Sequence, residues 1–89
     1  MTVYIPSIPS ALRSYTKQKS EVAAEGQTLA EVLSALDHRY PGLRFRIITE
    51  QGTIRQHIRI FVKEEQVRDL SVALQPEDQI HIICALSGG

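Results

Sequence analysis

The sequence has one cysteine, Cys84, among its 89 residues, and no tryptophan. A single cysteine excludes an internal disulfide, a tetrahedral zinc site built from cysteines and a cysteine-ligated iron–sulfur cluster. Structural disulfides belong mainly to oxidising compartments. The sequence therefore favours a reducing compartment, and we expect the protein in the cytoplasm.

The chain also lacks an excess of either charge, because its ten basic and ten acidic residues cancel. Nothing in this balance favours nucleic acid as the main partner. No apolar stretch approaches the roughly 18 residues that span a membrane, and the N-terminus lacks the pattern of a secretory signal. His38, His57 and His81 do not have the spacing of metal ligands. We therefore expect no nucleic-acid partner, no membrane contact and no metal site.

Two short strands are predicted in the first quarter of the chain. Residues 2–8 read as one strand and residues 19–23 as another, so they predict a β-hairpin with a long connection. The connection, residues 10–18, is polar and predicted as a loop. Pro6 has no amide hydrogen to donate and is expected at a sheet edge or a bulge.

The clearest local signal is a helix start at Thr28. Thr28 and Glu31 fit a capping box, in which the Thr28 hydroxyl accepts the Glu31 amide hydrogen and the Glu31 carboxylate accepts the Thr28 amide hydrogen. Apolar residues then recur at helical spacing and predict one face packed on a core, namely Leu29, Val32, Leu33 and Leu36. Pro41 and Gly42 end the helix after about three turns.

The second half of the chain predicts mainly strands. Residues 43–53 stay ambiguous, because alternation at Leu43, Phe45 and Ile47 fits a strand while the same residues also fit a short helix. The remaining elements are a strand at 57–62, a polar turn at 63–66, a short strand near Val67, a turn at 74–78 and a final strand at 79–86. This order predicts an α+β domain over residues 1–89, with a mixed sheet packed on one main helix.

The final strand separates core-facing from outward-facing residues. Ile80, Ile82, Cys84 and Leu86 fall on one face, and His81, Ile83 and Ala85 fall on the other. Ile60 and Val62 of the preceding long strand are expected to join the core face. We interpret Cys84 as a small core residue rather than a sulfur relay, because free cysteines are mostly buried.

The chain closes with Ser87, Gly88 and Gly89, which we expect to form a flexible tail over 87–89. A carboxylate carried by two residues without Cβ can enter a narrow active site that side chains would block. The tail is therefore the candidate site. The competing interpretation is a frayed terminus without function.

Several stretches resemble the MoaD/ThiS family of sulfur carriers, whose fold is the β-grasp, or ubiquitin-like, fold. They are residues 52–62, 63–67 and 74–82, followed by the final strand and Gly88-Gly89. Residues 8–13 and 61–68 resemble the branch of the family that carries sulfur for cysteine biosynthesis. Three positions depart from the family pattern: Lys63 replaces a common asparagine, Pro76-Glu77 replaces a glycine before the aspartate, and Cys84 replaces a common proline.

The resemblance implies a protein cosubstrate and not an enzyme, with no catalytic residue and no bound cofactor. An E1-like partner would use ATP to adenylate the Gly89 carboxylate, and sulfur would then replace AMP to give a thiocarboxylate. Gly88 and Ser87 would be required in the tail. Ile83, Ala85 and Leu86 are the candidates for docking on the partner.

The sequence leaves the sulfur acceptor open. A cysteine-synthase-like enzyme is favoured, and the alternative is that this chain is the small subunit of molybdopterin synthase, with the large subunit as its partner. Thiamine and secondary-metabolite carriers come next. A different class of function is a ubiquitin-like modifier joined through Gly89 to lysines of target proteins, and the last alternative is a binding module whose glycine tail has no role.

Four arginines close together in the sequence are the remaining feature. Arg44, Arg46, Arg55 and Arg59 lie in a stretch with only one acidic residue, Glu50. They predict either a basic patch for a partner or a solvated face, and the sequence leaves both interpretations open.

Overall fold

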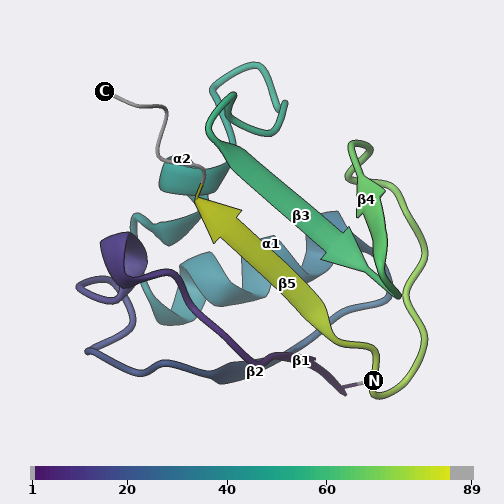
Figure 1. Ribbon diagram of the computed structural model, residues 1–89, viewed down its shortest axis with the longest axis horizontal. Helices are drawn as coiled ribbons and strands as arrows, with labels where there is room; N and C mark the ends of the chain where they lie inside the picture. Colours follow the sequence, from purple (N-terminus) through teal and green to yellow (C-terminus); the bar gives the residue numbers. More distant parts are fainter. Residues whose placement is uncertain (1, 85–89) are drawn as a thin grey trace.

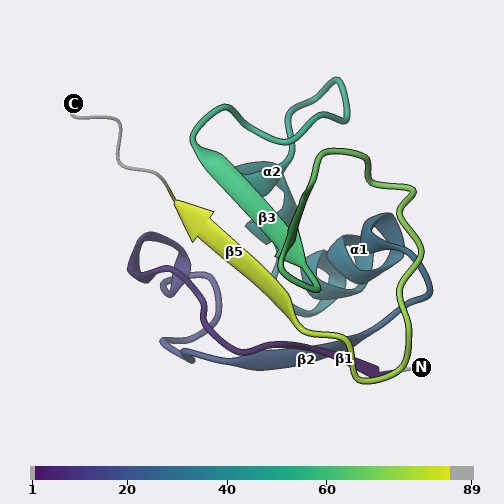
Figure 2. The ribbon, with the colours of Figure 1, turned by 45° about the vertical axis from the view of Figure 1, so that its right-hand side comes forward.

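The computed structural model describes residues 2–84, and Figure 1 shows how its elements are arranged. In chain order they are β1 (Thr2–Ile5), a 3₁₀ helix η1 (Ser10–Leu12), β2 (Val22–Glu25), α1 (Leu29–Arg39), α2 (Leu43–Ile47), β3 (Ile58–Val62), β4 (Glu65–Val67) and β5 (Ile80–Cys84). The predicted order of strands around one main helix is confirmed. Figure 2 shows α1 on one side of the β3 and β5 strands.

The strands form both antiparallel and parallel pairs. β1 pairs antiparallel with β2, and β3 pairs antiparallel with β4 on one side and β5 on the other. β1 and β5 meet in parallel at a bridge between Tyr4 and Gln79, where the Tyr4 amide donates to the Asp78 carbonyl at 2.9 Å. The prediction of a mixed sheet is therefore confirmed.

The first hairpin is confirmed, but its details differ from the prediction. β2 covers Val22–Glu25 and not residues 19–23. The connection contains η1 and buries Leu12 and Thr16, so it is more ordered than the expected polar loop. The Thr16 hydroxyl donates to the Lys19 carbonyl at 2.9 Å, which fixes the chain before β2. The order of this segment could not be predicted from an apolar pattern, because Thr16 is polar and is buried with a hydrogen-bond partner.

Helix α1 begins where the capping pattern predicts. The Thr28 hydroxyl accepts the Glu31 amide hydrogen at 3.2 Å. The return bond differs from the prediction, because the Glu31 carboxylate accepts from the Gln27 amide at 2.8 Å and not from that of Thr28. Thr28 has an extended backbone, with φ −131° and ψ 163°. The Gln27 amide, just before it, reaches the Glu31 carboxylate.

Residues distant in sequence complete the cap. The amide groups of Leu29 and Ala30 donate to the carbonyls of Val72 and Leu70, at 3.2 and 2.9 Å. These bonds satisfy two of the first helical amides, which have no partner within a helix. The segment before β5 is thereby attached to the start of α1.

Residues 43–53 are resolved as a short helix followed by a turn. Leu43 and Ile47 of α2 are buried one helical turn apart, while Phe45 between them is 52% exposed. The Asp37 carboxylate starts this helix, because it accepts from the amides of Gly42 and Arg44 at 3.1 Å each. The strand interpretation of this stretch is wrong.

The core lies between α1 and the inner face of the strands. The predicted stripe of α1 is at most 1% exposed at each of its four positions, Leu29, Val32, Leu33 and Leu36. The four residues predicted to face the helix belong to the same buried cluster, namely Ile60, Val62, Ile80 and Ile82. The predicted packing of the helix on the sheet is therefore confirmed.

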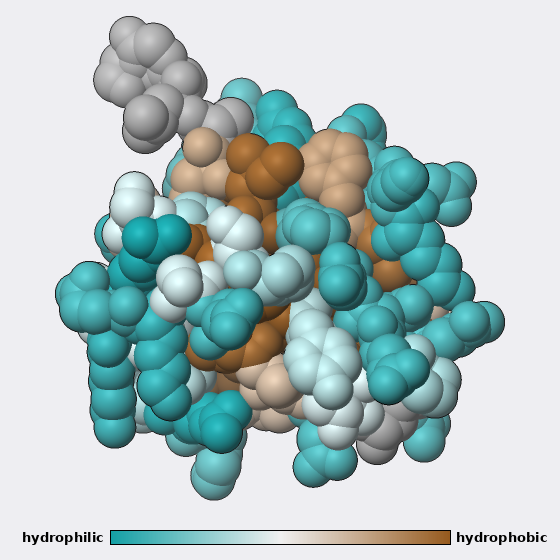
Figure 3. Space-filling model, turned by 60° about the horizontal axis from the view of Figure 1, so that its bottom comes forward, coloured by the Kyte–Doolittle hydropathy of each residue, from teal (hydrophilic) through white to brown (hydrophobic). Residues whose placement is uncertain are grey.

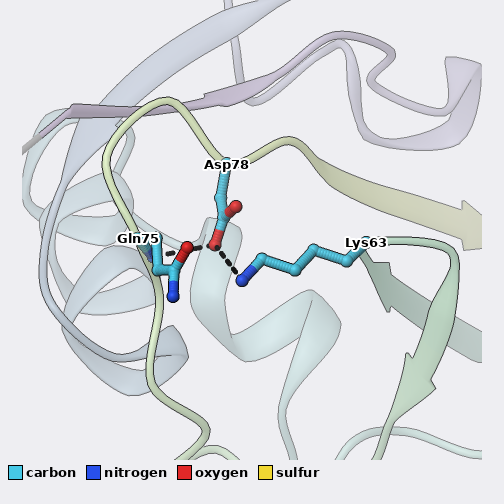
Figure 4. Close-up of polar contacts among 3 residues, drawn as sticks. All are labelled: Lys63, Gln75 and Asp78. Atoms are coloured by element: carbon cyan, nitrogen blue, oxygen red, sulfur yellow. Dashed lines mark hydrogen bonds and ion pairs between the residues drawn. The ribbon is translucent and has the colours of Figure 1, made fainter.

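Two tight turns lie at the end of the sheet where Val62 of β3 pairs with Ile80 of β5. Figure 4 shows the contact between them. Lys63 and Glu64 connect β3 to β4 with φ 55° and 68°, and Glu77 before β5 has φ 67°. The Lys63 ammonium lies 3.9 Å from the Asp78 carboxylate, which also accepts the Gln75 amide hydrogen at 2.8 Å. Lys63 and Glu77 depart from the family pattern at positions where the left-handed backbone favours asparagine or glycine.

Candidate functional site

Strand β5 leads from the core toward the predicted site. Its described part ends at Cys84, which pairs with Ile58 at the start of β3. The other predicted site residues lie outside the described residues, namely Ala85, Leu86, Ser87, Gly88 and Gly89. Their roles therefore stay predictions.

The outer face of β5 has the predicted exposure. Ile83 is 48% exposed and pairs across the ladder with Arg59. Phe61, His81 and Ile83 line a shallow hollow on this face. Figure 3 shows apolar side chains gathered among polar ones on one face of the molecule. The outward position of Ile83 is confirmed, and its use in docking remains a prediction.

Cys84 lies at the border between core and surface. It is partly buried and packs against the core cluster, beside the inward-facing residues of β5. Burial raises the pKa of the Cys84 thiol. A higher thiol pKa leaves less thiolate at neutral pH, and the thiolate is the nucleophile. The environment therefore supports the interpretation of Cys84 as a packing residue and gives no sign of a sulfur relay.

Within residues 2–84, no three histidine, cysteine, aspartate or glutamate side chains come close enough to hold a metal ion. None of the helices in this range has the length and apolar character needed to cross a bilayer.

The four arginines do not act as one group. The Arg46 guanidinium lies over the Tyr15 ring at 5.8 Å. Arg55 and Arg59 instead line a groove that also contains Arg68. Arg68 was missed in the sequence, since only the pairing of β3 with β4 brings it near the other two. The cross-strand register is the signal that could have identified it.

Comparison with known proteins agrees with this geometry. The family model described as the ThiS family matches residues 7–89. The chain is 34% identical over 88 residues to a protein of Mycobacterium tuberculosis named sulfur carrier protein CysO, covering 93% of this chain and 95% of that protein.

Solved structures extend the similarity to three dimensions. The crystal structure of Mycobacterium tuberculosis CysO matches with a TM-score of 0.87 and 32% identity, over 94% of this chain and 99% of that one. A chain of the Amycolatopsis orientalis BexX/CysO complex matches with a TM-score of 0.88 and 29% identity, over 98% and 99%. Small archaeal modifier protein 1 of Methanosarcina acetivorans matches with a TM-score of 0.78 and 25% identity, over 99% and 96%.

These matches cover nearly the whole chain, and the structural neighbours share its mixed sheet and main helix. The expected β-grasp, or ubiquitin-like, fold is therefore confirmed. Together with the family model over residues 7–89, the similarity shows that this chain belongs to the ThiS family.

Proposed function

We propose that this protein is a sulfur carrier whose reacting group is the carboxylate of Gly89. The observation that supports the proposal most directly is the family match, because it extends through Gly89 itself. The similarity to a protein named sulfur carrier protein CysO adds to it.

The proposed cycle starts with ATP. An oxygen of the Gly89 carboxylate attacks the α-phosphorus, pyrophosphate leaves, and an acyl-adenylate forms on an E1-like enzyme. The terminal sulfur of a persulfide donor then attacks the acyl carbon and displaces AMP. A second thiol breaks the sulfur–sulfur bond, forms a disulfide with the donor and releases the thiocarboxylate.

In this cycle the protein is a cosubstrate and its partners are the enzymes. ATP belongs to the activating partner, and the carrier itself needs no cofactor. Gly88 and Gly89 have no Cβ, so the reacting carbon can reach the active sites of two different partners. Ser87 joins this tail to β5, while the exposed Ile83, together with Ala85 and Leu86, provides apolar contact for docking.

The favoured acceptor is an enzyme of cysteine biosynthesis that resembles cysteine synthase. The proposal is supported by the 34% identity to a protein named sulfur carrier protein CysO. The Amycolatopsis orientalis BexX/CysO complex supports the coarser point that a carrier of this kind binds a partner protein. The large subunit of molybdopterin synthase is the alternative acceptor. A reducing cytoplasm suits both, because the thiocarboxylate and the single cysteine are open to oxidation.

A second candidate function is conjugation to other proteins. It is favoured by one observation, the 25% identity and TM-score of 0.78 to small archaeal modifier protein 1. The activation step would be the same. The product would differ, because the Gly89 acyl group would be transferred to the amino group of a lysine and not to sulfur.

Intact-mass measurement tests the two candidates against each other. The protein is incubated with ATP, the E1-like enzyme of its native host and a persulfide donor, and it is also isolated from that host. We expect a mass increase equal to the exchange of one oxygen for sulfur, located at Gly89. Lysine-linked conjugates in place of this species would support the modifier, and the absence of both would reject both.

The acceptor is then tested by transfer. Thiocarboxylated protein is mixed with a cysteine-synthase-like enzyme and its activated amino-acid substrate, or with the large subunit of molybdopterin synthase. We expect the carrier to lose sulfur only in the first mixture. Transfer only in the second would move the protein to molybdopterin synthesis.

A further inference from the structure

A groove on the surface lies beside the start of β3. Its walls come from the segment before β3, from β3 itself and from the end of β4, and they include Arg55, Ile58, Arg59, Val67 and Arg68. Ile58 pairs with Cys84, so the groove is one strand away from the point where β5 leads to the tail. Neighbouring strands are about 4.8 Å apart. Figure 1 shows the start of β3 next to the end of β5.

The groove has three arginines without a compensating acid. Within residues 2–84, no carboxylate forms an ion pair with Arg55, Arg59 or Arg68. The acidic residue next in sequence, Asp69, is engaged elsewhere, because its carboxylate accepts from the Ser71 amide and hydroxyl at 2.9 and 2.8 Å. These two hydrogen bonds lower the pKa of Asp69.

Two of the guanidinium groups are held in place by uncharged partners. Arg55 lies over the Phe45 ring at 4.6 Å, and its Nε donates to the Phe45 carbonyl at 2.7 Å. Arg59 donates to the carbonyl groups of Gln56 and Ile58. These contacts orient the positive charges without neutralising them, which prepares the groove to receive an anion at a lower entropic cost.

The strand register adds an independent observation. Ile60 and Val67 form the last pair of the β3–β4 ladder, and Arg59 and Arg68 are the residues that flank this pair on the two chain segments. Both side chains are exposed. Like charges that line the same groove repel each other. An anionic group between the two arginines would turn this repulsion into attraction.

We propose that this groove binds an acidic segment of the activating enzyme while the tail enters the active site. The inference rests on the proposed function and names the contact that orients the carrier. A protein segment fits better than a nucleic acid, because the chain as a whole has no net positive charge and the groove holds only three arginines. Within the described residues, β4 also pairs on one side only, which leaves an edge for an extended segment.

Charge reversal at Arg68 tests the groove without disturbing its other contacts. Arg68 makes no hydrogen bond within residues 2–84, so Arg68→Glu changes charge more than structure. The matched control is Lys19→Glu, the same change of charge at an exposed residue of the loop before β2, away from β4 in Figure 1.

The assay is the exchange of labelled pyrophosphate into ATP by the E1-like enzyme, with the full-length carrier as the varied substrate. We expect Arg68→Glu to raise KM about tenfold or more with little change in kcat, because charges at an interface act mainly on encounter and orientation. Lys19→Glu should match the wild type. The wild-type KM should also rise with salt, and this dependence should be weaker in Arg68→Glu.

Thermal denaturation provides the second readout. Arg68→Glu places a carboxylate in the same groove as Arg55 and Arg59 and removes a like charge there, so this variant should melt at the wild-type temperature or above it. A higher KM together with undiminished stability separates a binding role from a folding defect. If Arg68→Glu melts lower and Arg68→Gln, which only removes the charge, has the wild-type KM, the groove does not bind the enzyme.

Each further outcome decides the inference. Unchanged KM and salt dependence in Arg68→Glu, with active wild type, would overturn the groove proposal and leave the sulfur carrier intact. No exchange with the wild type would overturn both. Deca-glutamate peptide should compete with the carrier in the assay. Competition by a single-stranded oligonucleotide but not by deca-glutamate would identify the groove as a nucleic-acid site and reject an acidic protein segment.

Discussion

Gly26 occupies the tightest backbone position between β2 and α1. A Cβ added there would lie 2.8 Å from the Val32 amide nitrogen, 2.9 Å from Val32 Cγ2 and 3.0 Å from Glu31 Cβ. The backbone nitrogen is fixed in the first turn of α1 and cannot move aside. Gly26 therefore allows the chain to enter the helix at this close approach.

We predict that Gly26→Ala lowers the free energy of unfolding by about 1 to 3 kcal/mol, the usual cost of overpacking. Urea denaturation of both proteins measures the change. The control is Ser34→Ala on the exposed face of α1, which should stay within about 0.5 kcal/mol of the wild type. Equal stability of Gly26→Ala and the wild type would mean that the chain enters α1 along another path.

Cys84 makes a different prediction, which concerns pH. Burial raises the pKa of the Cys84 thiol in the folded protein. The thiol of the folded protein therefore keeps its proton at a pH where the thiol of the unfolded chain has begun to lose it. The contribution of the Cys84 thiol to the free energy of unfolding is fully present below its pKa in the unfolded chain, about 8.5. It is lost as pH rises through the higher pKa of the folded state.

We therefore expect the wild type to lose stability more steeply above about pH 8.5 than Cys84→Ala does. Chemical denaturation at a series of pH values compares the two slopes. Cys84→Ala should also support full pyrophosphate exchange and full thiocarboxylate formation. Loss of thiocarboxylate formation with normal exchange would restore the sulfur-relay interpretation of this residue.

Among the elements, the β3–β4 hairpin carries avoidable strain. Val62 pairs with Glu65, so Lys63 and Glu64 form a two-residue turn in which both φ angles are positive. Turns of this type favour Asn-Gly, because the left-handed backbone costs other residues about 1 to 2 kcal/mol each. The ion pair from Lys63 to Asp78 offsets little of this, since Lys63 is half exposed and such pairs contribute about 1 kcal/mol or less.

We predict that Glu64→Gly raises the free energy of unfolding by about 0.5 to 1 kcal/mol, after the extra chain entropy of glycine is subtracted. The matched control is Glu65→Gly, one residue later in β4, where the backbone is extended and glycine should destabilise. Thermal melts of both variants give the comparison. Destabilisation of both to the same degree would show that the Lys63-Glu64 turn is unstrained.

The elements also differ in how far the sequence determines them. Helix α1 was predictable because Thr28, Glu31 and the apolar stripe all lie within the helix or at its edge. Helix α2 was not, since its first turn is capped by Asp37 from α1 and begins after Gly42, whose φ is 96°. Contacts between residues of different elements leave no local pattern to read.

The same distinction applies to the candidate site at the scale of the whole molecule. Ile83 could be placed on the surface from the alternation of β5 alone, and the structure confirms it. Arg68 could not be assigned to the groove of Arg59, because the two residues come together only through the pairing of β3 with β4. The chemistry attributed to Gly89 was read from a resemblance of the whole chain, and its geometry lies outside the described residues.

The last prediction separates folding from function in the intact protein. Among residues 2–84, the buried cluster draws on every strand except β4 and on both α-helices. Removing Gly88 and Gly89 takes away no side chain and none of these contacts. We therefore expect the free energy of unfolding of the truncated protein, measured by thermal denaturation, to lie within about 0.5 kcal/mol of the wild-type value.

The same deletion should abolish pyrophosphate exchange by the E1-like enzyme, because the carboxylate then belongs to Ser87 and ends two residues short of the reacting position. Adding one alanine after Gly89 lengthens the tail instead, and it should block exchange equally while preserving stability. Restoring the end at Gly89 by proteolysis of that alanine should restore exchange. Full exchange with the truncated protein would reject the sulfur carrier and the modifier together, since both depend on activation at Gly89. The remaining interpretation would be a binding module whose glycine tail has no role.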